Sequence, residues 1–433
     1  MKKSSISILI FSILLICVWV SSNISWGKEN WKGILESDAK GYYAYLPAVF
    51  IYKDLNFTFF DSIEGKKYFD KNYYYDYRVT ANNNKINKYW CGTAICELPF
   101  FLIAHSLTHI TNHEADGYSK LYPIFINCAG IFYLVFGLYC LDKLMQIYNV
   151  TVKNRLIIIG LIFFATNLFY YTIVEPGMSH VFSFAWISFF LVQFKNLMIK
   201  FNWRNLLFAS ISIGLIFLIR PINILIIFFV PFLAGSLEGF ISFLRVVIKE
   251  KIKLFIALLF ILSIASIQIL LYKISCGQFF VDSYPGESFN FLNPHLFDLL
   301  FSYKKGLFLY TPFYLVCLFG LIYLFKNSKW EFFTFFIFFV IISYILSSWH
   351  NWWYGGSFSS RVFVDYLPIF GLTFGTLLQK SSAKIKNFTL AISVILVLLC
   401  QAQIYQYRYN LITWDSMTKE KYWEVFLRLD KIK

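Results

Sequence analysis

Charge is scarce in this sequence. Asp, Glu, Lys and Arg make up 15% of its 433 residues, whereas 58% of the residues are hydrophobic. A soluble domain carries about 25% charged residues, so the composition excludes an ordinary soluble globular protein and favours a polytopic membrane protein. The net charge is +15, but many of the basic residues fall in short loops between apolar runs and no compact basic domain is present. The charge therefore does not indicate nucleic-acid binding.

Motifs for nucleotide binding and for nucleophilic catalysis are also missing. The chain has no Walker loop, no dinucleotide-binding glycine fingerprint, no G-x-S-x-G elbow and no H-E-x-x-H sequence. These absences argue against an ATP-driven pump and against a nucleotide-sugar enzyme of the soluble type. The eight cysteines and six histidines form no cluster with zinc-ligand spacing. Internal repeats and low-complexity linkers are absent as well, so we predict a single domain over residues 1–433.

What the sequence does contain is a series of long apolar runs. They fall at residues 6–22, 120–141, 156–174, 179–198, 205–219, 222–237, 254–272, 307–325, 331–347, 362–379 and 387–403, with a weaker run at 97–110. A helix satisfies its own backbone hydrogen bonds in lipid, so each run predicts a helix. The predicted fold class is all-α, a polytopic membrane protein with about 11–13 transmembrane helices.

Lysine and arginine predict the orientation of the chain. Basic residues gather in five loops, at 143–155, 195–204, 238–253, 326–329 and 380–386, and Lys2 and Lys3 precede the first run. Successive loops are separated by two runs, so all five, and the N-terminus, are predicted to be cytoplasmic. The opposite face then receives a long first outer loop (about 23–95), the later polar turns and a C-terminal tail (about 404–433). A full crossing by residues 97–110 breaks this alternation, so that run is predicted to be short, tilted or re-entrant, unless another crossing has been missed.

The first outer loop carries the candidate for acid–base chemistry. Asp38 follows the first apolar run by roughly 18 residues and lies beside Tyr42 and Tyr43. A carboxylate held just outside the bilayer is placed to remove a proton from an acceptor at the lipid surface. A solvated loop residue is the alternative interpretation. Loops of this length are usually functional, and Lys88 near its end is either a phosphate ligand or an interfacial anchor.

Two turns between apolar runs carry ionisable residues at membrane depth, where such residues are costly and are functional candidates by default. Glu175 and His180 flank a Pro-Gly turn and are candidates to ligate a divalent metal ion or to orient a sugar hydroxyl. Arg220 precedes Pro221, which breaks the helix, and is a candidate ligand for an anionic lipid phosphate. The alternative for Arg220 is a side chain that snorkels toward the interface.

The late outer loops contain the densest cluster of polar and aromatic residues. Lys304 and Lys305 run against the orientation rule, which indicates a phosphate contact, with a solvated basic pair as the alternative. Segment 349–361 combines aromatic rings, paired glycines and a terminal arginine: Trp352, Trp353, Tyr354, Gly355, Gly356 and Arg361. Aromatic faces stack on sugar rings, and an arginine at the start of a helix can hold a phosphate oxygen. The alternative is an aromatic belt with an anchoring arginine.

These segments resemble the GT-C superfamily, whose members are polytopic glycosyltransferases that use polyprenyl-phosphate sugars. The chain is most similar to the bacterial branch that contains protein mannosyltransferases and aminoarabinose transferases. Residues 38–47, 175–180 and 352–361 carry the resemblance, together with the Lys-Tyr-x-x-Gly sequence that ends the first outer loop. One departure concerns Asp38, which follows Glu36 and Ser37 where an adjacent Asp-Glu or Asp-x-Asp pair is typical. This departure leaves metal dependence and the class of acceptor open.

The resemblance implies a GT-C-like fold with short interfacial helices in the first outer loop. It also implies a bacterial plasma-membrane location with the active site on the extracytoplasmic face. Asp38 would be the general base toward an acceptor hydroxyl or amine, and Glu175 would match a second acidic position that binds metal in some branches. The residues implied as ligands of the lipid phosphate are Lys88, Arg220, Lys304, Lys305 and Arg361. The remaining candidate substrate contacts are Tyr42, Tyr43, Glu175, His180, Trp352, Trp353 and Tyr354.

The predicted partners are a polyprenyl-phosphate sugar donor, membrane lipids and an acceptor that is a lipid, a glycan or a protein, with a divalent metal ion as a candidate cofactor. Two other functions remain open. One is a transporter or flippase of lipid-linked glycans, and the other is a non-catalytic scaffold in envelope assembly. A transporter is expected to carry internal repeats and charges near the bilayer midplane. This sequence has no repeat, and its charges fall at loop edges.

Overall fold

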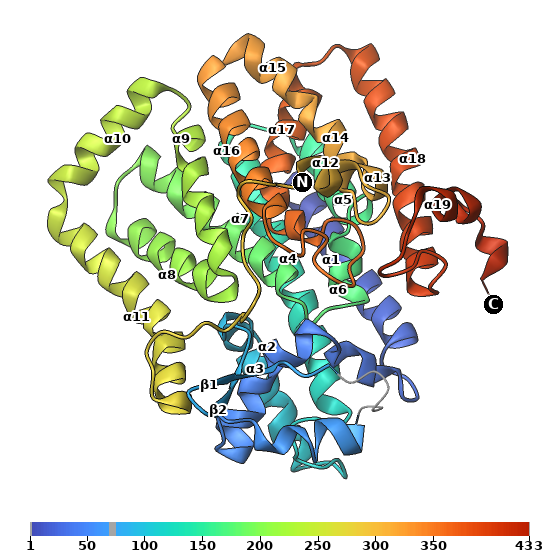
Figure 1. The fold of residues 1–433 in the computed structure, drawn as a ribbon. Coiled ribbons are helices and arrows are strands. Elements are labelled where there is room, and N and C mark those ends of the chain that lie inside the picture. The colour runs from blue at the N-terminus through green and yellow to red at the C-terminus, as the bar shows by residue number, and fades with distance from the viewer. Residues whose placement is uncertain (1, 69–74, 433) are drawn as a thin grey trace.

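The computed structural model describes residues 2–68 and 75–432, most of which are helical (Figure 1). The first helices are α1 (Lys2–Ile24), α2 (Asp38–Pro47), α3 (Gly92–Thr108), α4 (Leu121–Ile147), α5 (Val152–Phe164) and α6 (Leu168–Ile173). The middle of the chain contains α7 (Ser179–Ile199), α8 (Trp203–Ile219), α9 (Val230–Leu233), α10 (Leu237–Lys249) and α11 (Lys251–Cys276).

The last third begins with α12 (Leu296–Phe301), α13 (Leu307–Tyr310), α14 (Phe313–Leu318), α15 (Gly320–Asn327) and α16 (Lys329–Ser347). It ends with α17 (Leu367–Lys380), α18 (Ala383–Arg408) and α19 (Lys419–Val425). Short 3₁₀ or π helices lie at Asn30–Leu35, Ala48–Tyr52, Thr58–Phe60, Glu64–Tyr68, Pro221–Phe229, Arg361–Tyr366 and Leu429–Lys431. The only strands in the described part of the chain are β1 (Arg78–Ala81) and β2 (Asn84–Asn87).

Seven helical segments in the described ranges are long and apolar enough to cross a membrane, and the bent pair 221–233 and 237–249 makes an eighth if it forms one span. Several of them expose large apolar side chains. On α16, for example, Phe333, Phe336, Ile337 and Val340 are exposed, and their spacing of three to four residues places them on one stripe. An exposed apolar stripe on a spanning helix faces lipid, and the chain is an all-α polytopic membrane protein.

Several predicted crossings are short or broken, so length and composition support fewer spans than the 11–13 predicted. Residues 156–174 divide into α5 and α6, and residues 307–325 divide among α13, α14 and α15. Residues 222–229, the first half of the run 222–237, are 3₁₀ helix. Proline accounts for part of this result, because Pro221 and Pro312 each remove a backbone donor at a point where the helix is interrupted.

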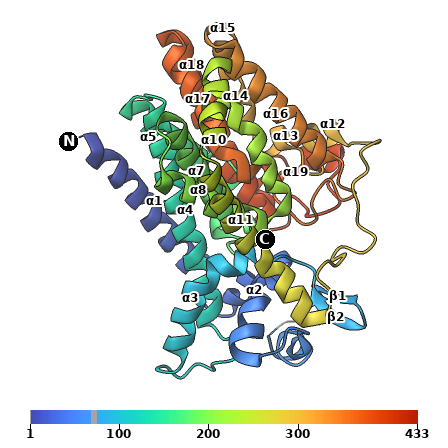
Figure 2. The ribbon, with the colours of Figure 1, turned by 90° about the vertical axis from the view of Figure 1, so that its left-hand side faces the viewer.

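Helix α3 begins and ends at the same end of the bundle. A Cβ on Gly92 would lie 2.2 Å from the backbone nitrogen of Ile219, so the start of α3 packs tightly against the end of α8. The loop that follows α3 returns to the first outer loop, where the hydroxyl of Tyr52 donates to the carbonyl of Asp116 at 2.8 Å. Figure 2 shows α3 beside α2, below the helix bundle. The weak run at 97–110 thus lies in a short helix, in agreement with the prediction that this run is short, tilted or re-entrant.

The five basic loops lie together at the other end of the bundle. Four hydrogen bonds join segments at or next to these loops: Gln379 Nε2 to Asn149 O (2.8 Å), Lys386 Nζ to Asn154 Oδ1 (2.7 Å), Lys195 Nζ to Leu233 O (2.6 Å) and Trp330 Nε1 to Pro231 O (2.9 Å). The alternation of basic loops in the sequence therefore corresponds to one end of the molecule. The compartment that this end faces stays a prediction.

The first outer loop is a folded cap that contains a β-hairpin, an element that the all-α prediction omitted. Arg78 pairs with Asn87 across the antiparallel hairpin. Asn82 and Asn83 form the turn with φ angles of 47° and 60°, which asparagine tolerates better than most residues. The Asn87 side chain donates to the carbonyl of Gly41 at 2.7 Å, and this bond fixes the hairpin to α2.

Candidate functional site

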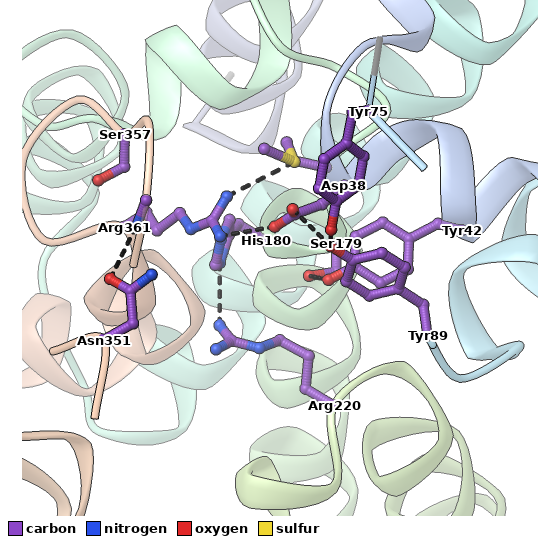
Figure 3. A network of polar contacts seen from close by, with 12 residues as sticks. Asp38, Tyr42, Tyr75, Tyr89, Ser179, His180, Arg220, Asn351, Ser357 and Arg361 are labelled. Atoms are coloured by element: carbon purple, nitrogen blue, oxygen red, sulfur yellow. Dashed lines mark hydrogen bonds and ion pairs between the residues drawn. The ribbon is translucent and has the colours of Figure 1, made fainter. Parts of the chain in front are cut away.

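Asp38 and Arg361 form the centre of the candidate site. Asp38 is the first residue of α2, and Arg361 begins the 3₁₀ helix that leads into α17. Although they are 323 positions apart in the chain, Arg361 Nη2 donates to Asp38 Oδ2 at 2.6 Å (Figure 3). Their side chains are only 16% and 12% exposed, respectively, so the pair is largely shielded from solvent. The fold thus places a carboxylate and a guanidinium side by side at the end of the bundle opposite the basic loops.

Two tyrosines complete the surroundings of the carboxylate. The hydroxyl of Tyr89 donates to Asp38 Oδ1 at 2.6 Å, and the hydroxyl of Tyr75 lies 2.5 Å from that of Tyr89. Burial by itself raises the pKa of Asp38, but the charge of Arg361 and the hydrogen bonds from Tyr89 and Arg361 outweigh it and hold the pKa below its ordinary value. Asp38 is therefore ionised at neutral pH and is able to accept a proton.

A second polar network surrounds Asp365, one turn after Arg361. The Asp365 side chain is fully buried. Its Oδ1 lies 2.8 Å from His180 Nδ1, and its Oδ2 accepts from Arg220 Nη1 at 3.0 Å and from Asn223 Nδ2 at 2.7 Å. Four elements meet at this carboxylate, namely α7, the end of α8, the 3₁₀ helix Pro221–Phe229 and the 3₁₀ helix that carries Arg361. The network therefore fixes the position from which Arg361 reaches Asp38.

His180 lies between the guanidinium groups of Arg361 and Arg220 (Figure 3). Arg220 Nη1 is 3.2 Å from His180 Nδ1, but a guanidinium is only a donor and is already bonded to the Asp365 carboxylate. We therefore place a hydrogen on His180 Nδ1, which donates it to the Asp365 carboxylate. That tautomer leaves Nε2 as the acceptor nitrogen of the ring.

Glu175 and Lys305 are two further ionisable groups near Arg361. The hydroxyl of Tyr170 donates to Glu175 Oε1 at 2.8 Å, while Glu175 Oε2 has no hydrogen-bond partner within the described ranges. Burial raises the pKa of Glu175 to about 7, against the opposing effects of Tyr170 and Arg361. Burial also lowers the pKa of Lys305 to about 7, although the charge of Glu175 opposes this shift. The site thus holds an acid and a base that both titrate close to neutrality.

The contacts of Lys305 and Lys88 differ in kind. Lys305 is buried, its ammonium group donates to the carbonyl of Ser357 and lies 4.7 Å from the ring centroid of Tyr407. Lys88 pairs with the carboxylate of Glu287. A phosphate at Lys88 would have to displace a carboxylate, whereas Lys305 has no carboxylate within ion-pair distance among the described residues.

Only one of the two adjacent tyrosines lies at the site. The Tyr42 ring packs 4.7 Å from that of Tyr89, and its hydroxyl accepts from Ser179 at 3.4 Å. Tyr43 points elsewhere, because it is fully buried and its hydroxyl donates to the carbonyl of Gly117 in the loop after α3. Tyr42 is thus placed near the carboxylate, and Tyr43 is a packing residue.

The aromatic residues that precede Arg361 in the chain pack mainly against other parts of the protein. Trp352 stacks on His295 with 5.6 Å between ring centroids, and the Tyr354 hydroxyl donates to the carbonyl of Leu346 at 2.9 Å. Lys304 lies 3.5 Å from the ring centroid of Trp353 and 3.3 Å from Asp415 Oδ1. These three aromatic residues and Lys304 make no described contact with Asp38.

The structure gives the metal candidates no third ligand. Across residues 2–68 and 75–432, no group of three or more His, Cys, Asp or Glu side chains is arranged to hold a metal ion. Glu175 bonds to Tyr170, and His180 bonds to Asp365. The chemistry that this arrangement supports with its own groups is proton transfer beside a cationic anion-binding position.

Tyr75, Tyr89, Asn223 and Asp365 belong to the site but were not among the predicted site residues. Tyr89 stands inside the sequence that ends the first outer loop, but only the folded hairpin brings its hydroxyl to Asp38. Asp365 lies inside the predicted apolar run 362–379, and a carboxylate within such a run is costly and is a signal of function. That signal was present in the sequence and identifies Asp365 without any structure.

No family model matches this chain, and no curated protein matches it in sequence. The chemistry of the site is therefore inferred from its geometry, with the resemblance to GT-C enzymes as a separate argument.

Proposed function

We propose that this protein transfers a sugar from a polyprenyl-phosphate-linked donor to a hydroxyl or amine of an acceptor. The single observation that carries the proposal is the contact between Asp38 and Arg361 at the end of the bundle opposite the basic loops. Sugar transfer from a phosphate donor requires a base for the acceptor and positive charge for the leaving phosphate. This pair places a carboxylate and a guanidinium in direct contact, and so could supply both.

In the reaction, the Asp38 carboxylate takes the proton from the acceptor hydroxyl while the acceptor oxygen forms a bond to the anomeric carbon. The bond between that carbon and the phosphate oxygen breaks, and the electron pair leaves with the polyprenyl phosphate. Arg361 stabilises the charge that develops on this leaving group, with Arg220 and Lys305 as further sources of positive potential. Attack opposite the leaving group inverts the configuration at the anomeric carbon.

The ion pair also explains how the base becomes available. While Asp38 and Arg361 bond to each other, the depressed pKa makes the carboxylate a weak base. A donor phosphate competes with Asp38 for the Arg361 guanidinium, because bidentate Arg–phosphate contacts are strong. Binding of the donor therefore frees the carboxylate for the acceptor, and the depressed pKa rises toward its ordinary value at that moment.

A flippase of lipid-linked glycans is the second candidate, because Asp365, Arg220 and His180 form a buried charged network at the ends of spanning helices. An assay of detergent-solubilised protein distinguishes the two functions. Transport requires a sealed compartment, whereas sugar transfer proceeds with solubilised protein and donor. Transfer of one sugar by purified protein in detergent supports the first candidate.

The test in cells uses a strain that lacks the native gene and is complemented with the wild type, Asp38→Asn or Asp282→Asn. Asp282 is an exposed carboxylate on the same end of the bundle and provides a matched control. Loss of a general base lowers the rate by roughly 10²- to 10⁴-fold, so Asp38→Asn is expected to abolish the product. Mass spectrometry of envelope lipids, polysaccharide and glycoproteins is expected to show a difference of one sugar that the wild type and Asp282→Asn restore.

Membrane levels of all three proteins are compared in the same cells. Full restoration of the product by Asp38→Asn at an equal protein level would show that Asp38 is not the base. It would favour the transport or scaffold function.

A further inference from the structure

The connection between α11 and α12, together with α12 itself, exposes many large apolar side chains. We call this segment, residues 277–301, the flap. Phe280 is 83% exposed, Phe297 73% and Leu292 99%. Between residues 289 and 301 the only acidic or basic side chains are His295 and Asp298, and they pair with each other at 3.0 Å. Exposed apolar patches of this kind mark contact with a protein or a membrane.

The flap is continuous with the lipid-facing surface of α16. Tyr344 lies on the same exposed stripe as Val340, one turn nearer the end of that helix. Its hydroxyl donates to the carbonyl of Phe291 at 2.6 Å, and the Tyr344 and Phe291 rings stack with centroids 6.1 Å apart. Three backbone hydrogen bonds hold the flap to the end of α16: Asn290 N to Ser348 O (2.6 Å), His295 N to Ser347 O (2.9 Å) and His350 N to Ser288 O (3.0 Å).

The middle of the flap faces the candidate site. Glu287 pairs with Lys88, and the ring of Tyr284 meets that of Tyr89 edge-on at 6.3 Å. Aromatic contacts run without a break from the lipid-facing stripe to the tyrosine that bonds Asp38, through Tyr344, Phe291, Phe289, Trp349, Tyr284 and Tyr89. The flap is therefore polar where it meets the site and apolar where it continues the surface of α16.

We propose that the flap inserts its apolar tip, Phe291 to Phe297, into the lipid leaflet at the site end of the bundle. The partner is the bilayer itself, because the exposed side chains extend a surface that already faces lipid and because the tip contains no lysine, arginine, aspartate or glutamate. Interfacial segments of this kind bury their apolar face roughly 5–10 Å into the boundary between headgroups and acyl chains. In that position the flap separates the Asp38–Arg361 pair from the surrounding lipid. The proposal uses only surface and contacts, so it stands independently of the reaction proposed above.

The test uses reporter cysteines in the full-length protein, reconstituted in phosphatidylcholine vesicles. Leu292→Cys and Phe297→Cys place a thiol in the tip, and Asn112→Cys places one in the exposed loop after α3 as a control. The native cysteines are buried, with Cys128 half-buried, so the wild type gives the background of labelling. Each protein is labelled with bimane and exposed either to brominated acyl chains in the membrane or to iodide in the water.

Bimane at positions 292 and 297 is expected to be quenched by brominated chains and protected from iodide, at a depth of roughly 5–10 Å. Bimane at position 112 is expected to show the reverse. Quenching of the two tip positions by iodide alone would overturn the proposal. Protection from both quenchers would also overturn it, since it would mean that a second copy of the protein covers the tip. Two tip positions are used so that, if one variant folds poorly, the other still tests the proposal.

Discussion

At the scale of single residues, the hydroxyl of Tyr89 helps to set the pKa of Asp38, the proposed base. Its hydrogen bond to Asp38 Oδ1 favours the ionised carboxylate and lowers the pKa of Asp38. Tyr89→Phe removes that bond, so the pKa rises. Because the base must be deprotonated, the acidic limb of the pH profile of kcat/KM is expected to move to higher pH. A hydrogen bond to a charged group is worth about 1.5–3 kcal/mol, which corresponds to a shift of about one pH unit or more.

Tyr75→Phe is the matched control for this prediction. The hydroxyl of Tyr75 lies against that of Tyr89 but makes no described contact with Asp38. Its removal is expected to move the acidic limb less than Tyr89→Phe does. An unchanged limb in Tyr89→Phe would show that Asp38 is not the group whose protonation limits the reaction.

A second prediction at this scale concerns the contribution of Asp365 to the stability of the protein. Asp365→Asn keeps the size of the side chain but leaves the Arg220 guanidinium in a buried position without its counter-charge. Breaking a buried pair in this way costs about 3–5 kcal/mol. We expect a lower melting temperature for the solubilised protein.

The control for that prediction is Asp298→Asn, which breaks the exposed pair with His295 and is expected to cost less than about 1 kcal/mol. Equal melting temperatures for Asp365→Asn and the wild type would contradict the structural role of the Asp365 network.

At the scale of elements, the packing of α2 against the β-hairpin decides where Tyr89 stands. A Cβ on Gly41 would lie 2.2 Å from Cδ2 of Tyr89, so the glycine is what allows the ring to reach Asp38. Gly41→Ala is expected to push the ring away, to shift the acidic limb in the same direction as Tyr89→Phe and to cost about 1–3 kcal/mol of stability. The measurements are the pH profile and the melting temperature.

Gly160→Ala is the companion variant. Gly160 lies inside α5, and a Cβ there would meet no atom within 4 Å. Alanine is favoured over glycine within a helix by about 0.8–1.0 kcal/mol, so this change is expected to raise stability slightly and to leave the pH profile unchanged. An unchanged pH profile in Gly41→Ala would mean that the Tyr89 hydroxyl still bonds Asp38 despite the added methyl group.

The elements also show where a pattern of hydrophobicity is informative and where it is not. Each long apolar run of the sequence falls on a helical segment, because a run of this length in lipid has no other way to satisfy its backbone. The hairpin was not foreseen, since strands of four residues leave almost no periodic signal and Asn82 and Asn83 are equally common in loops. The breaks in residues 156–174 and 307–325 were not foreseen either, because hydrophobicity does not record where a helix bends.

At the scale of the whole molecule, the shared position of the five basic loops predicts the topology. The N-terminus and these loops are expected in the cytoplasm, and the C-terminal tail is expected on the other face. Fusions of a fluorescent protein that matures only in the cytoplasm, and of a phosphatase that is active only outside it, distinguish the two faces. We expect fluorescence for a fusion after Ser382 and phosphatase activity for a fusion at the C-terminus. The opposite result would place the Asp38–Arg361 pair in the cytoplasm.

The sequence by itself determined the membrane class, the helical fold and the grouping of basic loops, and it singled out Asp38 and Arg361 as separate candidates. These properties depend on composition and on local runs of residues, which short-range physical chemistry governs. Only the tertiary structure decided that Asp38 and Arg361 meet, that Tyr43 points away while Tyr89 points inward, and that Asp365 organises His180 and Arg220. Those relations join positions far apart in the chain, and they depend on how helices pack, which no local pattern of residues encodes.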